Sequence, residues 1–344
     1  MRREQAILAG LALSTSLFGV ECQAKQPEQP IAWAHPSRVV RLPDGRAINF
    51  RCSGTGQPTV ILEGGWAANS LAWNGVRERV SDRRRVCAYD RAGAGFSDPG
   101  PEPRDGSAIA RDLDLALRAA RIQGPFILVG HSAGGLYIRL LANRRPKDVA
   151  GFVFVDPSVE YQDRRIDEMF GPGASSLASL RQRSQVCLAA AEAGALPSTE
   201  PKLASCTPPA NPTLPPSVNA ASLAEARRPE TWRTQLSELD SLWTSTSDDI
   251  ARGPASYGDV PLIVLTADGN EPSAHHPVNS GPAPFWVRLH QELAARSRRG
   301  VQTIVQGTSH LMMNDRPDAI VAAINTVIDE ASVTFSRRPD GKRK

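Results

Sequence analysis

The pentapeptide GHSAG at residues 130–134 places Ser132 between two glycines, each two positions away. It follows an apolar run at 126–129 and precedes a helical pattern from about residue 135. This order predicts a strand, a sharp turn and a helix, the setting in which a serine hydroxyl is lifted clear of a sheet edge. The pattern therefore favours Ser132 as a nucleophile over an incidental serine in a glycine-rich connection.

A serine hydroxyl attacks an acyl carbonyl only when a base removes its proton, and the resulting oxyanion needs two N–H donors. The first donor is expected to be Ala133, at the N-terminus of the predicted helix, where the helix dipole favours negative charge. The second is expected to be Gly65, which follows the apolar run at 59–62, with Trp66 as the alternative.

Apolar runs and helical patterns alternate along two parts of the chain, which predicts a mostly parallel sheet covered by helices on both faces. The expected strands lie at 38–44, 47–53, 59–62, 86–89, 126–129, 152–155, 261–266 and 301–305, and the expected helices at 107–121, 135–143, 284–298 and 317–331.

Between these parts, residues 158–257 show no strand signal. Helical patches at 163–170, 175–193, 217–227 and 231–250 are expected there, with a proline-rich connector between the second and the third. We therefore expect one α/β core, formed by residues 36–157 and 258–333, with a helical cap at 158–257 inserted after the sixth strand.

Four segments together resemble the α/β-hydrolase superfamily: GHSAGG at 130–135, YDRAGAGFSD at 89–98, FVDP at 154–157 and GTSH at 307–310. The likeness covers about 38–156 and 260–331. It implies a serine hydrolase acting on a carboxylic ester, and a structural role for the loop at 90–98. One departure is that Glu63-Gly64 stands where the family usually has His-Gly in the oxyanion loop.

In this fold the base follows the last strand, which assigns the role to His310 among the six histidines. The acid that orients it is Asp156 or Asp268, because each follows a strand at a position that supplies the acid in this fold. Asp268 comes earlier after its strand than the usual loop would place it, so Asp156 is favoured. The other aspartate is expected to cap a loop at a strand end.

Residues 1–24 have the form of a cleaved secretory signal: Arg2 and Arg3, an apolar run at 6–20 and a small-residue site ending at Ala24. Fifteen apolar residues are too few for a typical membrane span, so a retained anchor is the less favoured alternative. The protein is thus expected to be exported, to the periplasm or outside the cell.

Export would leave four cysteines, an even number that favours disulfides over four free thiols. The strand order of the α/β-hydrolase fold places the strands of Cys52 and Cys87 side by side, which implies that these two pair. Cys187 and Cys206 both lie in the helical segment and flank the first part of its proline-rich connector, and we expect them to pair with each other.

The 344 residues are 41% hydrophobic and 22% charged, with a net charge of +4, as in globular proteins. The basic residues of the C-terminal stretch 334–344 are expected to form a solvated, disordered tail, not a nucleic-acid site. No metal or nucleotide motif is present, so no cofactor is expected. The expected partner is a small acyl substrate, with no stable membrane span after processing; the sequence does not indicate an oligomeric state.

Cleavage of a carboxylic ester through an acyl-enzyme is the function that these residues predict. Amide or small-peptide hydrolysis and lactone hydrolysis are alternatives, because the same triad serves them. A silent ligand-binding member of the fold is the non-enzymatic alternative, although such proteins usually lose the serine or the histidine. Ser132 argues against the dehalogenases and epoxide hydrolases of this fold, whose nucleophile is an aspartate.

Overall fold

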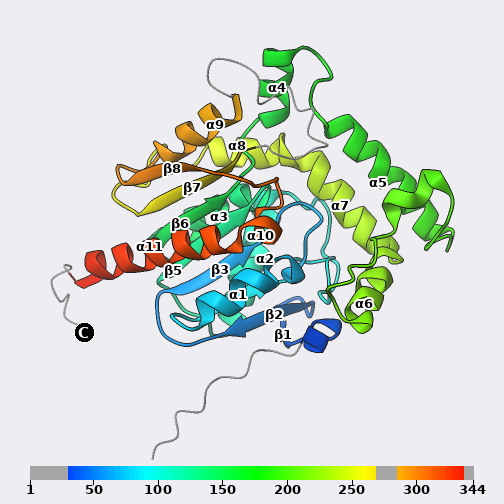
Figure 1. Cartoon of the computed structure of the whole chain (residues 1–344), viewed down its shortest axis with the longest axis horizontal. Helices are drawn as coiled ribbons and strands as arrows, with labels where there is room; N and C mark the ends of the chain where they lie inside the picture. The colour runs from blue at the N-terminus through cyan, green and yellow to red at the C-terminus, as the bar shows by residue number, and fades with distance from the viewer. Residues whose placement is uncertain (1–29, 269–284, 337–344) are drawn as a thin grey trace, which may run out of the picture.

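The computed structural model describes residues 30–268 and 285–336 (Figure 1). An eight-stranded sheet runs through its centre in the order β1-β2-β4-β3-β5-β6-β7-β8. In chain order the strands are β1 (Arg38–Arg41), β2 (Ala47–Ser53), β3 (Thr59–Glu63), β4 (Val86–Tyr89), β5 (Phe126–His131), β6 (Val149–Val155), β7 (Leu262–Ala267) and β8 (Gly300–Val305).

The central strands are short apolar runs because helices cover both faces of the sheet. Every residue of β3, β4 and β5 is buried. β1 pairs with β2, and β2 with β4, in antiparallel register, whereas β3 to β8 pair in parallel. The mostly parallel α/β-hydrolase sheet predicted from the sequence is confirmed.

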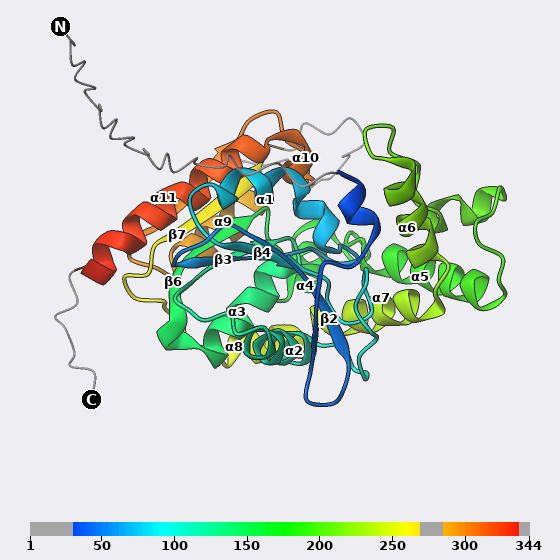
Figure 2. The same ribbon diagram turned by 90° about the horizontal axis from the view of Figure 1, so that it is seen from below.

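Two layers of helices cover the sheet, one on each face (Figure 2), and apolar side chains pack between each layer and the sheet. One contains α2 (Gly106–Ala119), α3 (Gly134–Arg144) and the end of α9 (Phe285–Ala294). The other contains α1 (Asn74–Ser81), α10 (Met312–Asp315) and α11 (Pro317–Ser336). Neither α1 nor α10 was expected. α11 extends past the predicted boundary at 333, and residues 337–344 of the expected tail lie outside the described residues.

The chain between β6 and β7 forms helices, as expected after the sixth strand. Residues 231–250 were expected to form one helix, but they form parts of two: the first helix ends at Leu242 and the second begins at Ser245. This last helix packs against α2 and α3 of the core. The helices are α4 (Gln162–Phe170), α5 (Leu177–Glu192), η4 (Pro201–Cys206), α6 (Pro216–Ala226), α7 (Pro229–Leu242) and α8 (Ser245–Ala251).

Two disulfides join the cysteines in the expected pairs. Cys52 and Cys87 lie directly opposite each other on β2 and β4, with 2.08 Å between their sulfur atoms. Cys187 and Cys206 join α5 to η4 at 1.99 Å, within a small apolar core that includes Trp232. None of the described helices has the length and apolar character needed to cross a membrane. The expected signal at 1–24 lies outside the described residues.

The Cys187–Cys206 bond should contribute to stability by restricting the unfolded chain. It closes a loop with a sequence separation of 19 residues, for which about 3 kcal/mol is expected. We therefore expect the double variant Cys187→Ala/Cys206→Ala to lower the free energy of unfolding by about 2–4 kcal/mol, measured by urea denaturation. Equal stability of the variant and the oxidised wild type would contradict this prediction. The comparison variant is Cys52→Ala/Cys87→Ala, which lacks the disulfide of the sheet instead.

Candidate active site

Ser132 lies in the tight turn between β5 and α3, with a φ of 50°, in the left-handed region that costs a non-glycine residue about 1–3 kcal/mol. Two hydrogen bonds hold this backbone: Ser132 N–H donates to Val155 O (3.2 Å), and Ser158 N–H donates to Ser132 O (2.9 Å). A Cβ atom on Gly130 would lie 2.6 Å from Gly134 O, and one on Gly134 would lie 2.6 Å from Glu63 O. Both glycines are therefore required for this turn.

Asp156 follows β6, the neighbour of β5, and is 3% exposed. Its Oδ2 accepts a hydrogen bond from His310 Nδ1 at 2.7 Å. Its Oδ1 accepts from the backbone N–H of Ala267 at 3.0 Å and from Trp286 Nε1 at 2.9 Å. A carboxylate held by three donors fixes the orientation of the imidazole, and a proton on Nδ1 leaves Nε2 as the basic nitrogen of the ring.

Burial raises the pKa of Asp156, but the hydrogen bond from His310 and the field of the nearby histidines lower it by more. The net pKa lies well below the usual range, so the carboxylate is ionised at neutral pH. It therefore presents a negative charge to the imidazole, which stabilises the protonated ring that forms when a base accepts a proton.

Asp268, the alternative acid, follows β7 and binds the loop that carries His310. Its carboxylate accepts from the N–H groups of Gly307 (2.7 Å) and Thr308 (3.0 Å). These contacts match the loop-capping role expected for whichever aspartate does not orient the histidine.

Two other histidines are buried and support this geometry. His131 donates from Nε2 to the carbonyl of His310 at 2.8 Å; burial, and then the charge of His310, lower the pKa of His131 to about 3. The imidazole of His290 bonds to the Thr266 hydroxyl (2.7 Å) and to Pro157 O (2.9 Å), and burial lowers its pKa. Both rings are therefore neutral at pH 7. His275 and His276 lie outside the described residues.

Gly65 and Ala133 both lie next to Ser132. A Cβ atom on Gly65 would be 3.0 Å from Ser132 Cβ and 2.9 Å from His131 Nδ1, so only glycine allows the loop after β3 to approach this closely. Within the described residues, neither the N–H of Gly65 nor that of Ala133 has a hydrogen-bond acceptor. Two unpaired N–H groups beside the serine can stabilise an oxyanion.

The sequence analysis missed the charged network that holds this loop. The guanidinium of Arg91, which is 3% exposed, forms ion pairs with Glu63 (2.8 Å) and with Glu238 of α7 (3.0 Å). It also donates to the carbonyls of Gly64 (2.9 Å) and Gly65 (2.7 Å). In a trans peptide the carbonyl and the N–H point in opposite directions. By binding Gly64 O, Arg91 therefore directs the Gly65 N–H away from itself.

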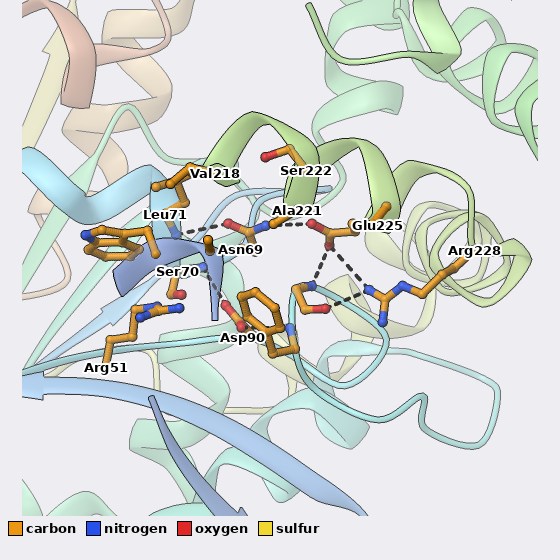
Figure 3. Close-up of a pocket in the computed structure, with 15 residues that line it drawn as sticks. Arg51, Asn69, Ser70, Leu71, Asp90, Val218, Ala221, Ser222, Glu225 and Arg228 are labelled. Atoms are coloured by element: carbon orange, nitrogen blue, oxygen red, sulfur yellow. Dashed lines mark hydrogen bonds and ion pairs between the residues drawn. The ribbon is translucent and has the colours of Figure 1, made fainter. Parts of the chain in front are cut away.

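A cavity of about 330 Å³ lies beside this network, between α6 and the loops after β3 and β4 (Figure 3). Glu225 accepts from Asn69 Nδ2 (2.7 Å) and from Gly95 N–H, and Arg228 donates to Gly95 O (2.7 Å). Asp90 accepts from the Ser70 N–H at 2.8 Å. These polar groups bind the helical segment to the core.

The chain belongs to the alpha/beta hydrolase family, whose sequence profile matches residues 60–323. An AB hydrolase superfamily protein of Gibberella zeae is 32% identical over 130 residues, which are 36% of this chain and 40% of that protein. The uncharacterized protein YqjL of Bacillus subtilis is 29% identical over 129 residues, 37% of this chain and 50% of that protein. The chain thus spans half or less of the length of these curated relatives.

Two solved structures show the same fold at low sequence identity. A thermophilic esterase from Thermogutta terrifontis aligns with a TM-score of 0.56 and 18% identity, over 86% of this chain and 99% of the other. Epoxide hydrolase CorEH aligns with a TM-score of 0.59 and 15% identity, over 85% and 98%.

Glu63 should make stability depend on pH. Burial raises its pKa to about 6 from 4.5, against the opposing effect of Arg91. Between these values the folded state binds more protons than the unfolded state, so stability falls as pH rises through this range. The loss should be about 2 kcal/mol, and Glu63→Gln should remove it, as measured by urea denaturation at pH 4.5 and pH 7.

Glu160→Gln is the matched control. Burial opposes ionisation of Glu160, but its hydrogen bonds with Arg139 bring its pKa to about 2, outside this range. The control should therefore keep the wild-type difference between the two pH values to within about 0.5 kcal/mol. An unchanged difference in Glu63→Gln would show that Glu63 does not titrate in this range.

Proposed function

We propose that this protein is a serine hydrolase that cleaves a carboxylic ester, or a related acyl bond, through an acyl-enzyme. The observation that carries the proposal is the 2.7 Å hydrogen bond between His310 and the buried carboxylate of Asp156, at the sheet edge where Ser132 sits in its strained turn. In this proposal Ser132 is the nucleophile, His310 the base and Asp156 the orienting acid, each from a different loop.

In the proposed mechanism, Ser132 Oγ attacks the carbonyl carbon while His310 Nε2 accepts the hydroxyl proton. Asp156 stabilises the imidazolium, and the N–H groups of Gly65 and Ala133 bind the oxyanion. The tetrahedral intermediate collapses as the imidazolium gives its proton to the leaving alcohol. Water, deprotonated by His310, then attacks the acyl-enzyme and releases the acid and the free serine.

The identity of the nucleophile favours acyl chemistry over epoxide or halide chemistry. Alkylation of a serine would give an ether, which water does not readily cleave, whereas acylation gives an ester that a second attack hydrolyses. Amide and lactone hydrolysis use the same steps and are distinguished by substrate alone. A binding protein without catalytic activity would not need the unpaired N–H groups at Gly65 and Ala133.

We further propose that residues 158–257 act as a cap over the core formed by 36–157 and 258–333, and that the protein is exported. Trp66, the residue after Gly65, donates from Nε1 to Gln235 O of α7, so the cap reaches the loop that carries Gly65. Two disulfides are compatible with an oxidising compartment.

Ser132→Ala should abolish hydrolysis, because no other group replaces the attacking oxygen. We expect kcat for 4-nitrophenyl butyrate to fall about 10⁵- to 10⁶-fold. A fluorophosphonate probe should label wild-type Ser132 and leave the variant unlabelled, while circular dichroism reports the fold. Near-normal turnover in a folded variant would refute the serine mechanism.

Asparagine substitutions should separate the two aspartates. Asp156→Asn keeps the size of the side chain but removes the charge that orients His310, so kcat should fall about 10⁴-fold. Asp268→Asn retains one acceptor oxygen for the loop N–H groups and should affect kcat far less. If Asp268→Asn costs more turnover than Asp156→Asn, the two roles must be exchanged.

A further inference from the structure

Trp66 lies where the loop after β3 meets two helices of the proposed cap. Its indole N–H donates to Gln235 O of α7 at 2.8 Å. The guanidinium carbon of Arg183, on α5, lies 5.7 Å from the centre of the Trp66 ring, within the range of a cation–π contact. Gly65 precedes Trp66, and a Cβ atom on Gly65 would lie 3.0 Å from Ser132 Cβ, so the Arg183 charge is held beside the loop that approaches the nucleophile.

Arg183 differs from neighbouring arginines in having no counter-ion among the residues that the structure describes. Arg181, on the same helix, pairs with Asp240 at 2.5 Å, and Arg233 of α7 pairs with Glu192 at 2.5 Å. Over the described part of the chain, Arg183 is half-buried and makes neither an ion pair nor a hydrogen bond, and its Nε is buried. A guanidinium carries a positive charge and five N–H donors.

A buried N–H without an acceptor costs about 1–3 kcal/mol, so this arrangement is unfavourable unless something else binds there. Gln235 adds a second group of this kind, because its Oε1 is also buried without a donor among the described residues. The two side chains come from different helices and both belong to residues that contact Trp66. By contrast, the charged groups around the cavity in Figure 3 already have protein partners.

We propose that Arg183 and Gln235 form a subsite for an anionic group of the substrate, and that the preferred substrate is an ester carrying a carboxylate remote from the scissile bond. This rests on the proposed hydrolase function. The guanidinium donates charge-assisted hydrogen bonds to the carboxylate, while Trp66 holds the guanidinium plane in place. The Gln235 amide can rotate so that its NH₂ donates to the same carboxylate.

Two esters of equal acyl length test the subsite: 4-nitrophenyl hydrogen glutarate, which is anionic, and 4-nitrophenyl pentanoate, which is neutral. The ratio of their kcat/KM values, anionic over neutral, should fall about 10- to 100-fold in Arg183→Met, mainly through KM for the anionic ester. Arg183→Lys should retain part of the preference. Arg181→Met, on the same helix, is the matched control and should keep the wild-type ratio.

The outcomes separate this proposal from the proposed function. Hydrolysis of both esters with an equal ratio in wild type and Arg183→Met would overturn the anionic subsite and leave the hydrolase intact. Failure of the wild type to cleave either ester would count against the function. In that case, calorimetry of glutarate binding to Ser132→Ala and to Ser132→Ala/Arg183→Met still decides the subsite, because equal affinities would overturn it.

Discussion

A buried positive charge, the guanidinium of Arg91, joins three parts of the molecule that are distant in sequence. Removing an arginine from water costs several kcal/mol, and only close partners with good geometry offset this. Arg91 has such partners in Glu63 at the end of β3, in Glu238 of α7 and in two successive carbonyls. The loop beside Ser132 therefore cannot shift without breaking contacts that the buried charge requires.

Strain at the neighbouring strand ends is held in a similar way. Ser132 and Asp156 both adopt positive φ, at 50° and 40°, directly after β5 and β6. The hydrogen bonds from Ser132 N–H to Val155 O and from Ser158 N–H to Ser132 O link the two turns. Each turn therefore supports the other, and the two side chains are brought to one sheet edge by backbone contacts that leave their polar atoms available.

Local sequence patterns were sufficient to predict the strands, because a strand buried on both faces of the sheet is a run of apolar residues. They were also sufficient to predict the turn at Ser132, because that turn requires glycines at fixed positions. They failed for α1, whose sequence NGVRERVS is largely polar although it packs Val76 and Val80 into the core. They also predicted one helix where the structure has α7 and α8, because the helical periodicity of the sequence continues across the break after Leu242. Such boundaries are set by tertiary packing.

The choice between Asp156 and Asp268 depended on loop geometry that spacing indicates only weakly. The Arg91 network depended on contacts across 28 and 147 positions, which no local pattern reveals. One signal was present: Glu63 replaces the family's histidine at one strand end, and Arg91 follows β4, the strand beside β3. Neighbouring parallel strands end at the same edge of a sheet, so a carboxylate and a guanidinium at these two strand ends are expected to lie close together.

The helical segment between β6 and β7 connects two neighbouring strands of one sheet. Recombination or engineering could therefore exchange it for another segment without changing the strand order. Glu238 limits that freedom. A foreign segment without a carboxylate at this place would deprive Arg91 of one of the two acidic partners that it has in the described part of the chain. A chimera would therefore have to inherit Glu238 together with Arg91, so the inserted helices and the loop beside Ser132 form one unit of inheritance.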